Sequence, residues 1–137
     1  MKVQVRYYSR SGNTKILAEA IAKGVNTKAI SIDDSNALIS DKTDVLFIGG
    51  ALYAYGLDNK IKEYIANLDS SNIKKAVVFS TSWISKHSID LIKKALKNKG
   101  IDVVEEYIYY KNKPSNNELK EAEELAKKLI ELKEGER

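Results

Sequence analysis

Apolar strand-like runs alternate with amphipathic helical segments along the whole chain, and this alternation limits the fold more than any other feature. We expect strands at residues 2–8, 28–32, 44–48, 76–79 and 103–110, with helices between them and after the last one. Strands that are apolar on consecutive residues, separated by amphipathic helices, are typical of a parallel sheet covered on both faces. A chain of 137 residues fits one domain, so we expect a single doubly wound α/β domain over residues 1–137.

Punctuating residues set the expected helix ends. We expect the first helix to span residues 14–23 and to stop at Gly24, while Asp58 and Ser88 are expected N-caps of the next two helices. The segment from Ser115 to Glu118 has the spacing of a capping box for the last helix. Residues 33–43 are polar and weakly patterned, and residues 37–39 can form one turn of helix.

A hydroxyl-rich loop joins the first strand to the first helix. Its residues are Ser9, Arg10, Ser11, Gly12, Asn13 and Thr14. A helix N-terminus offers free N–H groups and a partial positive charge to an anion, hydroxyls add donors, and a glycine lets the backbone approach closely. The loop is therefore suited to hold a phosphate. The alternative interpretation is a turn that caps a helix and binds nothing.

The spacing Ser9-x-Ser11-Gly12-x-Thr14 resembles the phosphate loop of the flavodoxin family, which follows the first strand in that family too. The resemblance covers nearly the whole chain and looks closest to the short-chain members. It implies a five-stranded sheet in the order 2-1-3-4-5 and the cofactor FMN, with its phosphate in this loop. Two roles stay open for Arg10, which either pairs with the phosphate or faces solvent.

Two further loops follow the third and fourth strands and should open on the same crevice, because parallel strands share one carboxyl edge. By resemblance they would hold the flavin through Leu52, Tyr53, Ala54, Tyr55 and Gly56 in one loop and Thr81, Ser82 and Trp83 in the other. Tyr53 or Tyr55 would flank one face of the ring, and Trp83 the other. The alternative is that these aromatic side chains pack over the sheet edge or the end of the core. His87 is interpreted as a bystander or a weak cap.

Composition excludes several other classes. The chain has no cysteine, which excludes disulfides, thiol catalysis and thiolate metal sites, and we expect no metal. No apolar run approaches a membrane span, and the chain begins directly with strand-like residues, so we expect a cytoplasmic protein. The net charge is +4, and residues 1–114 carry a net +6. The lysines are scattered over helix faces, so we expect no nucleic-acid partner.

Three functions remain. The first is an FMN-binding electron carrier that works between redox partner proteins, as a monomer or weak dimer. The second is a small FMN-dependent reductase that uses NAD(P)H and a quinone-type acceptor, although we see no segment for a nicotinamide. The third is a flavin-free regulatory or binding module with the same fold. Many flavodoxins are acidic around the flavin and dock onto basic partners, and this sequence departs from that pattern because its flavin loops hold Lys86 and one acid, Asp58.

Overall fold

The computed structural model describes residues 1–53, 56–82 and 86–131, and for Tyr53 only the backbone is described. Strands and helices alternate as the sequence predicts. The elements are β1 (Val3–Tyr7), α1 (Asn13–Gly24), β2 (Ala29–Ser31), β3 (Thr43–Gly49), β4 (Leu52–Tyr53), β5 (Gly56–Leu57), α2 (Asn59–Ala66), the 3-10 turn η1 (Ser70–Asn72), β6 (Ile73–Ser80), α3 (His87–Asn98), β7 (Val103–Tyr109) and α4 (Asn116–Glu131).

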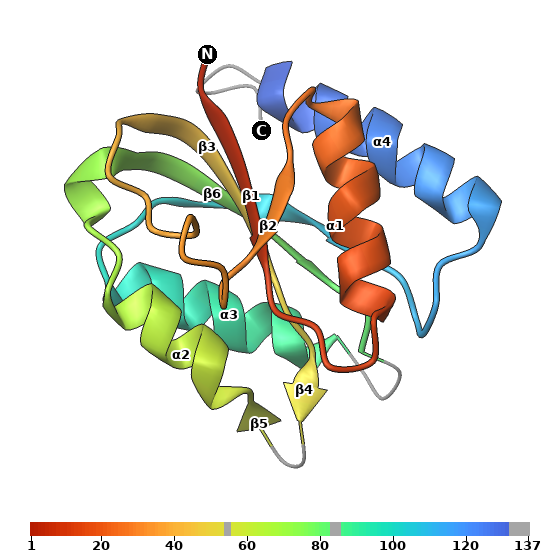
Figure 1. The fold of residues 1–137 in the computed structure, drawn as a ribbon, viewed down its shortest axis with the longest axis horizontal. Coiled ribbons are helices and arrows are strands. Elements are labelled where there is room, and N and C mark those ends of the chain that lie inside the picture. The colour runs from red at the N-terminus through yellow and green to blue at the C-terminus, as the bar shows by residue number, and fades with distance from the viewer. Residues whose placement is uncertain (54–55, 83–85, 132–137) are drawn as a thin grey trace.

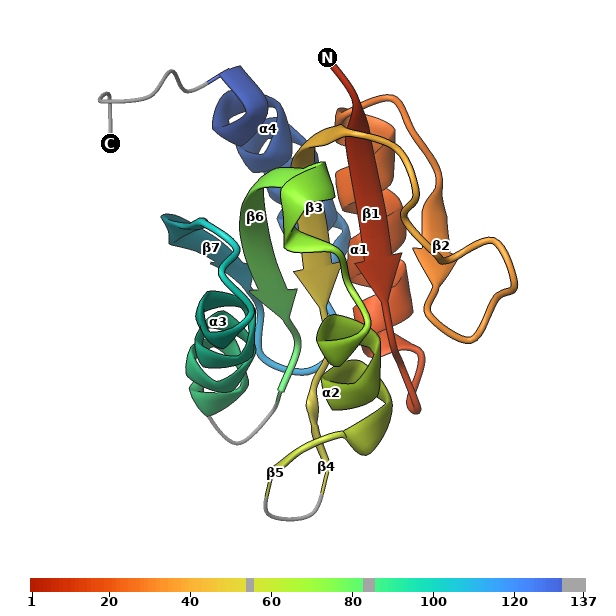
Figure 2. The ribbon, with the colours of Figure 1, turned by 90° about the vertical axis from the view of Figure 1, so that its left-hand side faces the viewer.

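The main sheet has the order β2-β1-β3-β6-β7, and every neighbouring pair in it is parallel. Counted along the sheet strands alone, this is the order 2-1-3-4-5 that the family resemblance implies. Figures 1 and 2 show α1 and α4 on one face of the sheet and α2 and α3 on the other. The prediction of a doubly wound parallel sheet is confirmed.

Each face of the sheet has its own core. The side chains of β1, β3, β6 and β7 that face α1 and α4 form one buried cluster, centred on Phe47 and Phe79. Those facing α2 and α3 form the other, which includes Leu46, Ile48 and Val78. Consecutive residues of a strand therefore enter different cores, which explains why the strands read as continuous apolar runs. In the described part of the chain, no helix combines the length and apolarity needed to cross a membrane.

Two of the predicted helix starts are confirmed. The Asp58 carboxylate accepts a hydrogen bond from the Lys60 N–H at the start of α2. Before α4, the Ser115 Oγ accepts from the Glu118 N–H, and the Glu118 carboxylate accepts from the Ser115 N–H. This is the reciprocal pairing of a capping box. Both helices therefore begin where their side chains satisfy backbone donors.

The prediction that Ser88 caps α3 is wrong. The N-cap position is Lys86, which makes no side-chain capping bond, and Ser88 lies inside the helix. Its hydroxyl is buried and lies 2.6 Å from the Ser80 hydroxyl at the end of β6. The Ser88 hydroxyl, which was expected to cap the helix, therefore pairs with the Ser80 hydroxyl of the sheet instead.

Gly24 is also present for a different reason from the one expected. It is the last residue of α1 rather than a left-handed stop, and the left-handed residue is Asn26, with φ 58°. A Cβ at Gly24 would overlap the Glu123 carbonyl of α4 and would lie 2.8 Å from the Glu123 Cα. The missing side chain therefore allows the backbones of α1 and α4 to come into contact.

Residues 37–39 do not form helix. Ala37 and Ile39 are buried, and the Ala37 carbonyl accepts hydrogen bonds from the Arg6 Nε at 2.8 Å and the Tyr64 hydroxyl at 2.5 Å. These tertiary bonds hold the segment in an irregular conformation. The expected loop after β3 also contains a two-stranded antiparallel hairpin, β4–β5, which the apolar sequence did not reveal as strand.

Candidate functional site

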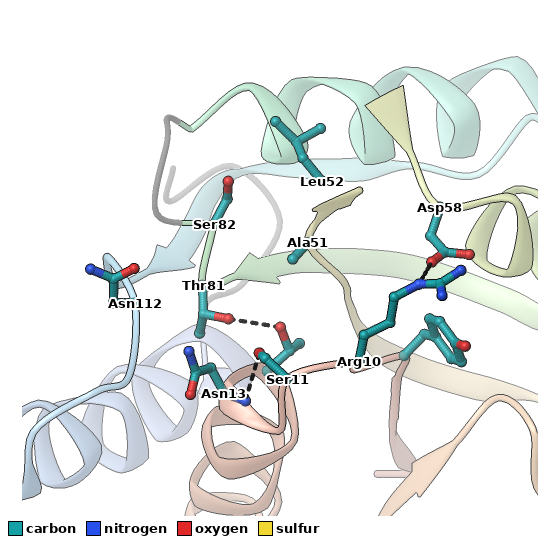
Figure 3. A pocket seen from close by; sticks show the side chains of 11 residues that line it. Arg10, Ser11, Asn13, Ala51, Leu52, Asp58, Thr81, Ser82 and Asn112 are labelled. Atoms are coloured by element: carbon teal, nitrogen blue, oxygen red, sulfur yellow. Dashed lines mark hydrogen bonds and ion pairs between the residues drawn. The ribbon is translucent and has the colours of Figure 1, made fainter. Parts of the chain in front are cut away.

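A cleft of about 250 Å³ lies at the carboxyl ends of β1, β3, β6 and β7. Figure 3 shows Arg10 and Asp58 at one side of this cleft and Asn112 at the other. The lining residues are Tyr8, Arg10, Ser11, Asn13, Thr14, Ala51, Leu52, Asp58, Thr81, Ser82 and Asn112. They come from four loops that only the folded sheet brings together. Ligands of doubly wound sheets bind at this edge, beside the point where the strand order reverses.

The first of these loops curves around the N-terminus of α1. Gly12 is the N-cap residue and has φ 94°, a left-handed conformation that glycine adopts without strain. The Ser9 Oγ accepts a hydrogen bond from the Gly12 N–H at 2.9 Å, and the Ser11 Oγ accepts from the Asn13 N–H at 3.3 Å. The loop is therefore held in shape by its own hydroxyls.

The end of α1 itself is suited to an anion. The N-cap residue makes no side-chain capping bond, and the first turn, all of which the structure describes, holds no acidic residue. N–H groups of a first helical turn have no acceptor within the helix, and the helix dipole adds a partial positive charge. A phosphate group has the charge and the acceptor oxygens that this end of the helix lacks.

A pair of buried threonine hydroxyls connects this loop to the loop after β6. The Thr14 Oγ1 lies 2.7 Å from the Thr81 Oγ1, and both residues are at most 5% exposed. One hydroxyl of such a pair donates to the other, so the second keeps its own hydrogen for another acceptor. Thr81 and Ser82 both line the cleft, so this wall is polar although it is buried.

An ion pair closes the opposite side. The Arg10 Nε lies 2.6 Å from the Asp58 Oδ2, and the Arg10 guanidinium lies 5.8 Å from the centre of the Tyr8 ring. Asp58 is only 5% exposed, whereas the Arg10 side chain is half exposed. The pair joins the loop after β1 to the start of α2. It also neutralises Asp58, the one carboxylate among the described residues that line the cleft, so Asp58 does not repel an anion at full strength.

The pKa of Asp58 reflects these contacts. Burial acts to raise the pKa of this carboxyl, but the hydrogen bonds from Arg10 and from the Lys60 N–H, with the charges of both residues, outweigh burial and lower it. A group whose pKa is lower in the folded state stabilises the fold above its unfolded pKa. That stabilisation is lost as the pH falls through the folded pKa.

Asp58→Asn should therefore reduce stability in a pH-dependent way. Losing a buried, charge-assisted hydrogen bond to Arg10 should lower the free energy of unfolding by about 1–3 kcal/mol at pH 7. The difference from the wild type should begin to shrink below about pH 4, where the carboxyl of the unfolded chain takes up a proton, and should be lost as the pH falls through the lowered pKa of folded Asp58. Urea unfolding at several pH values measures it. A stability difference that is the same at pH 3 and pH 7 would contradict the ion pair.

The structure brings seven of the residues predicted from the sequence to the cleft: Arg10, Ser11, Asn13, Thr14, Leu52, Thr81 and Ser82. Ser9 and Gly12 do not line it but shape the loop. Gly56 lies in β5 and is not a lining residue, and the backbone of Tyr53 lies in β4. Ala54, Tyr55 and Trp83 lie outside the described residues.

Four lining residues were not among the predicted site residues: Tyr8, Ala51, Asp58 and Asn112. Asp58 was expected as a helix cap and as the one acid of the flavin loops, but its pairing with Arg10, 48 positions away, was not predicted. Asn112 follows β7 in a left-handed conformation, φ 63°, which asparagine tolerates better than most residues. An asparagine in the short loop after the last strand is the signal that would have pointed to it.

The geometry agrees with comparisons to known proteins. Residues 4–114 match the family model described as a flavodoxin domain. The chain belongs to the flavodoxin family. No curated protein matches the chain. The family model includes the phosphate loop, the β4–β5 hairpin, Thr81 and Asn112, so the whole cleft lies within the matched residues.

Solved structures show the same fold. A flavodoxin from the domain Archaea is 24% identical and has a TM-score of 0.79, over 96% of this chain and 97% of the other. Flavodoxin 1 from Bacillus cereus is 22% identical, with a TM-score of 0.78, over 97% of this chain and all of the other. The Flv1 flavodiiron core from Synechocystis sp. PCC6803 is 25% identical, with a TM-score of 0.75, over 93% of this chain but 34% of its own length. The flavodoxin fold therefore accounts for nearly the entire chain.

Proposed function

We propose that this chain is an FMN-binding electron carrier. The observation that carries the proposal is the polar cleft at the N-terminus of α1, where a flavodoxin-type loop is completed by the buried Thr14–Thr81 pair. Membership of the flavodoxin family supports the same function. The proposal treats residues 1–137 as one FMN-binding domain that works in the cytoplasm with redox partner proteins.

The residues present fit the phosphate end of FMN. Ser11, Thr14 and the N–H groups of the first turn of α1 would donate to the phosphate oxygens, and Ser9 and Gly12 would hold the loop around them. Thr81, Ser82 and Asn112 would bind the hydroxyls of the ribityl chain. Leu52 gives the cleft an apolar wall toward the ring end. The expected ring contacts, with Tyr53, Tyr55 and Trp83, remain predictions from the sequence.

When bound, FMN supplies one- and two-electron transfer at its ring system. The contribution of this chain is to bind, orient and shield the cofactor. Negative charge beside a flavin disfavours the anionic reduced form, and Asp58, the one carboxylate found among the described lining residues, is paired with Arg10. We therefore expect a reduction potential less negative than in flavodoxins whose flavin loops are acidic.

Anaerobic, stepwise photoreduction of the FMN-loaded protein tests the carrier function. A carrier should be reduced in two separate one-electron stages that are visible in the absorption spectrum. It should also oxidise NADPH or NADH no faster than free FMN does in the presence of a quinone. Rapid NAD(P)H oxidation with a quinone would instead identify the reductase. If the protein does not bind FMN, the electron carrier and the reductase are both excluded, and the flavin-free regulatory or binding module remains.

A further inference from the structure

The loops that frame the cleft carry positive charge almost exclusively. Residues 8–12, 50–58, 81–86 and 110–115 follow β1, β3, β6 and β7, and their charged members are Arg10, Asp58, Lys86, Lys111 and Lys113. All four cationic residues are exposed, and Asp58 is buried and paired with Arg10, so the net positive charge of these loops comes from Lys86, Lys111 and Lys113. We call these four residues the cationic rim.

Each member of the rim is connected to the cleft. Arg10 lines it, and Lys111 and Lys113 flank the lining residue Asn112. The Lys86 Nζ donates a hydrogen bond to the Tyr107 hydroxyl at 3.0 Å, and it also lies 5.9 Å from the centre of the Tyr109 ring. The Tyr109 hydroxyl donates in turn to the Ser82 carbonyl at 2.5 Å. The rim residues thus lie in the loops after β1, β6 and β7, three of the four loops that contribute residues to the cleft.

Nearby acids offset this charge only in part. Asp33, after β2, lies 3.5 Å from Lys60 and is balanced by it. Glu118 keeps its charge while it accepts the hydrogen bond of the capping box, and it lies in α4 rather than in a cleft loop. Asp90 is exposed, but it lies one turn inside α3 rather than in a cleft loop. Charges of one sign around a cleft focus the field at its mouth and speed the approach of an oppositely charged partner.

We propose that the redox partner of this protein docks on the cationic rim through an acidic protein surface. The proposal rests on the proposed function, because the rim matters for electron transfer only if the cleft holds FMN. Exposed tyrosine and arginine side chains are common anchors of protein interfaces, and Tyr107, 38% exposed, lies beside Lys86. Complementary charge at such a surface governs the association rate more than the affinity.

A protein partner fits the rim better than a nucleic acid does. Proteins that bind single strands offer aromatic faces on which bases stack. The Tyr107 ring is contacted instead by the Lys86 and Lys93 ammonium groups, whose nitrogens lie 5.4 and 5.2 Å from its centre. The cationic residues also belong to separate loops at the cleft rather than to one strand or helix along which a nucleic acid can run.

Reoxidation kinetics of the FMN-loaded protein test whether the charge on the cationic rim acts on molecules that approach the flavin. The protein is photoreduced and mixed with either ferricyanide, a trianion, or hexaammineruthenium(III), a trication. Each ion accepts one electron, so two ions reoxidise one fully reduced flavin, and the flavin protons go to solvent. Raising the ionic strength from about 20 to about 300 mM shortens the Debye screening length to several ångströms. This should slow the ferricyanide reaction about tenfold and speed the ruthenium reaction.

Two matched double variants locate the effect. Lys86→Glu/Lys113→Glu should slow the ferricyanide reaction about tenfold at low salt and flatten its salt dependence. Lys74→Glu/Lys99→Glu changes the net charge equally at exposed positions near the opposite edge of the sheet, and it should change the rate less than about twofold. Equal effects of the two variants, or a ferricyanide reaction that speeds up with salt, would overturn the proposal. A protein that takes up no FMN fails before this experiment and refutes the proposed function instead.

Competition separates the two partner classes. Sodium poly-L-glutamate should slow ferricyanide reoxidation of the wild type more than single-stranded DNA does at the same concentration of charge. Poly-L-glutamate should slow the ferricyanide reoxidation of the Lys86→Glu/Lys113→Glu variant much less than that of the wild type. If the DNA slowed ferricyanide reoxidation more than poly-L-glutamate does, the assignment of an acidic protein partner would be overturned.

Discussion

FMN affinity should fall about 10–100-fold when Thr14 is replaced by valine, because a hydrogen bond to a charged group contributes about 1.5–3 kcal/mol. Valine keeps the shape of the buried side chain, which is 1% exposed, and removes only the hydroxyl. Riboflavin lacks the phosphate, so its affinity should stay within about threefold of the wild-type value. Quenching of flavin fluorescence measures both dissociation constants.

Thr43→Val is the matched control for this variant. Thr43 is also a buried threonine, but it begins β3 at the other edge of the sheet, where its hydroxyl donates to the Asp41 carbonyl at 3.2 Å. Both variants should lose about 1 kcal/mol of stability. Only Thr14→Val should lose FMN affinity. An equal loss in both variants would mean that Thr14 acts through general stability rather than by donating to the phosphate.

Gly24→Ala should lower the melting temperature by about 5–15 °C, through a loss of about 1–3 kcal/mol. Elsewhere in a helix this change normally stabilises, because alanine is the better helix former. Here the added methyl group would meet the backbone of Glu123, which cannot rotate away, so α4 must move from α1. Differential scanning calorimetry checks the sign directly.

Lys23→Ala is the control for Gly24→Ala. The Lys23 side chain is 79% exposed, and its ammonium lies 3.8 Å from a Glu123 carboxylate oxygen in a surface pair that contributes little. Its replacement should change stability by less than about 0.5 kcal/mol. FMN affinity should be unchanged in both variants because the cleft lies at the opposite end of α1. A stabilised Gly24→Ala protein would show that α1 and α4 are not in close contact.

The sequence predicts the fold well because its strongest signals are local. Consecutive apolar residues in Thr43–Gly49 and Ile73–Ser80 indicate strands buried on both faces, and both strands lie in the middle of the sheet. The capping box at Ser115 needs only residues within one turn. The phosphate loop is equally local, because one strand end, one glycine and one helix start define it.

What the sequence does not predict depends on contacts between distant residues. Asp58 reads as a helix cap, and its pairing with Arg10 appears only when the sheet brings the two loops together. The sequence around Ser88 predicts a helix cap, but in the fold the Ser88 hydroxyl pairs with that of Ser80. Gly24 reads as a stop signal until α4 packs on it. In each case a tertiary contact either adds to the local role, as at Asp58, or replaces it, as at Ser88.

Backbone amide resonances of the 15N-labelled protein, followed as FMN is added, test the location of the site most directly. The amides of residues 9–15 should shift with either FMN or inorganic phosphate, because both would bind the N-terminus of α1. Those of Thr81, Ser82 and Asn112 should shift with FMN and much less with phosphate. Binding of FMN that leaves residues 9–15 unperturbed, or no binding at all, would contradict the assignment of this cleft as the flavin site.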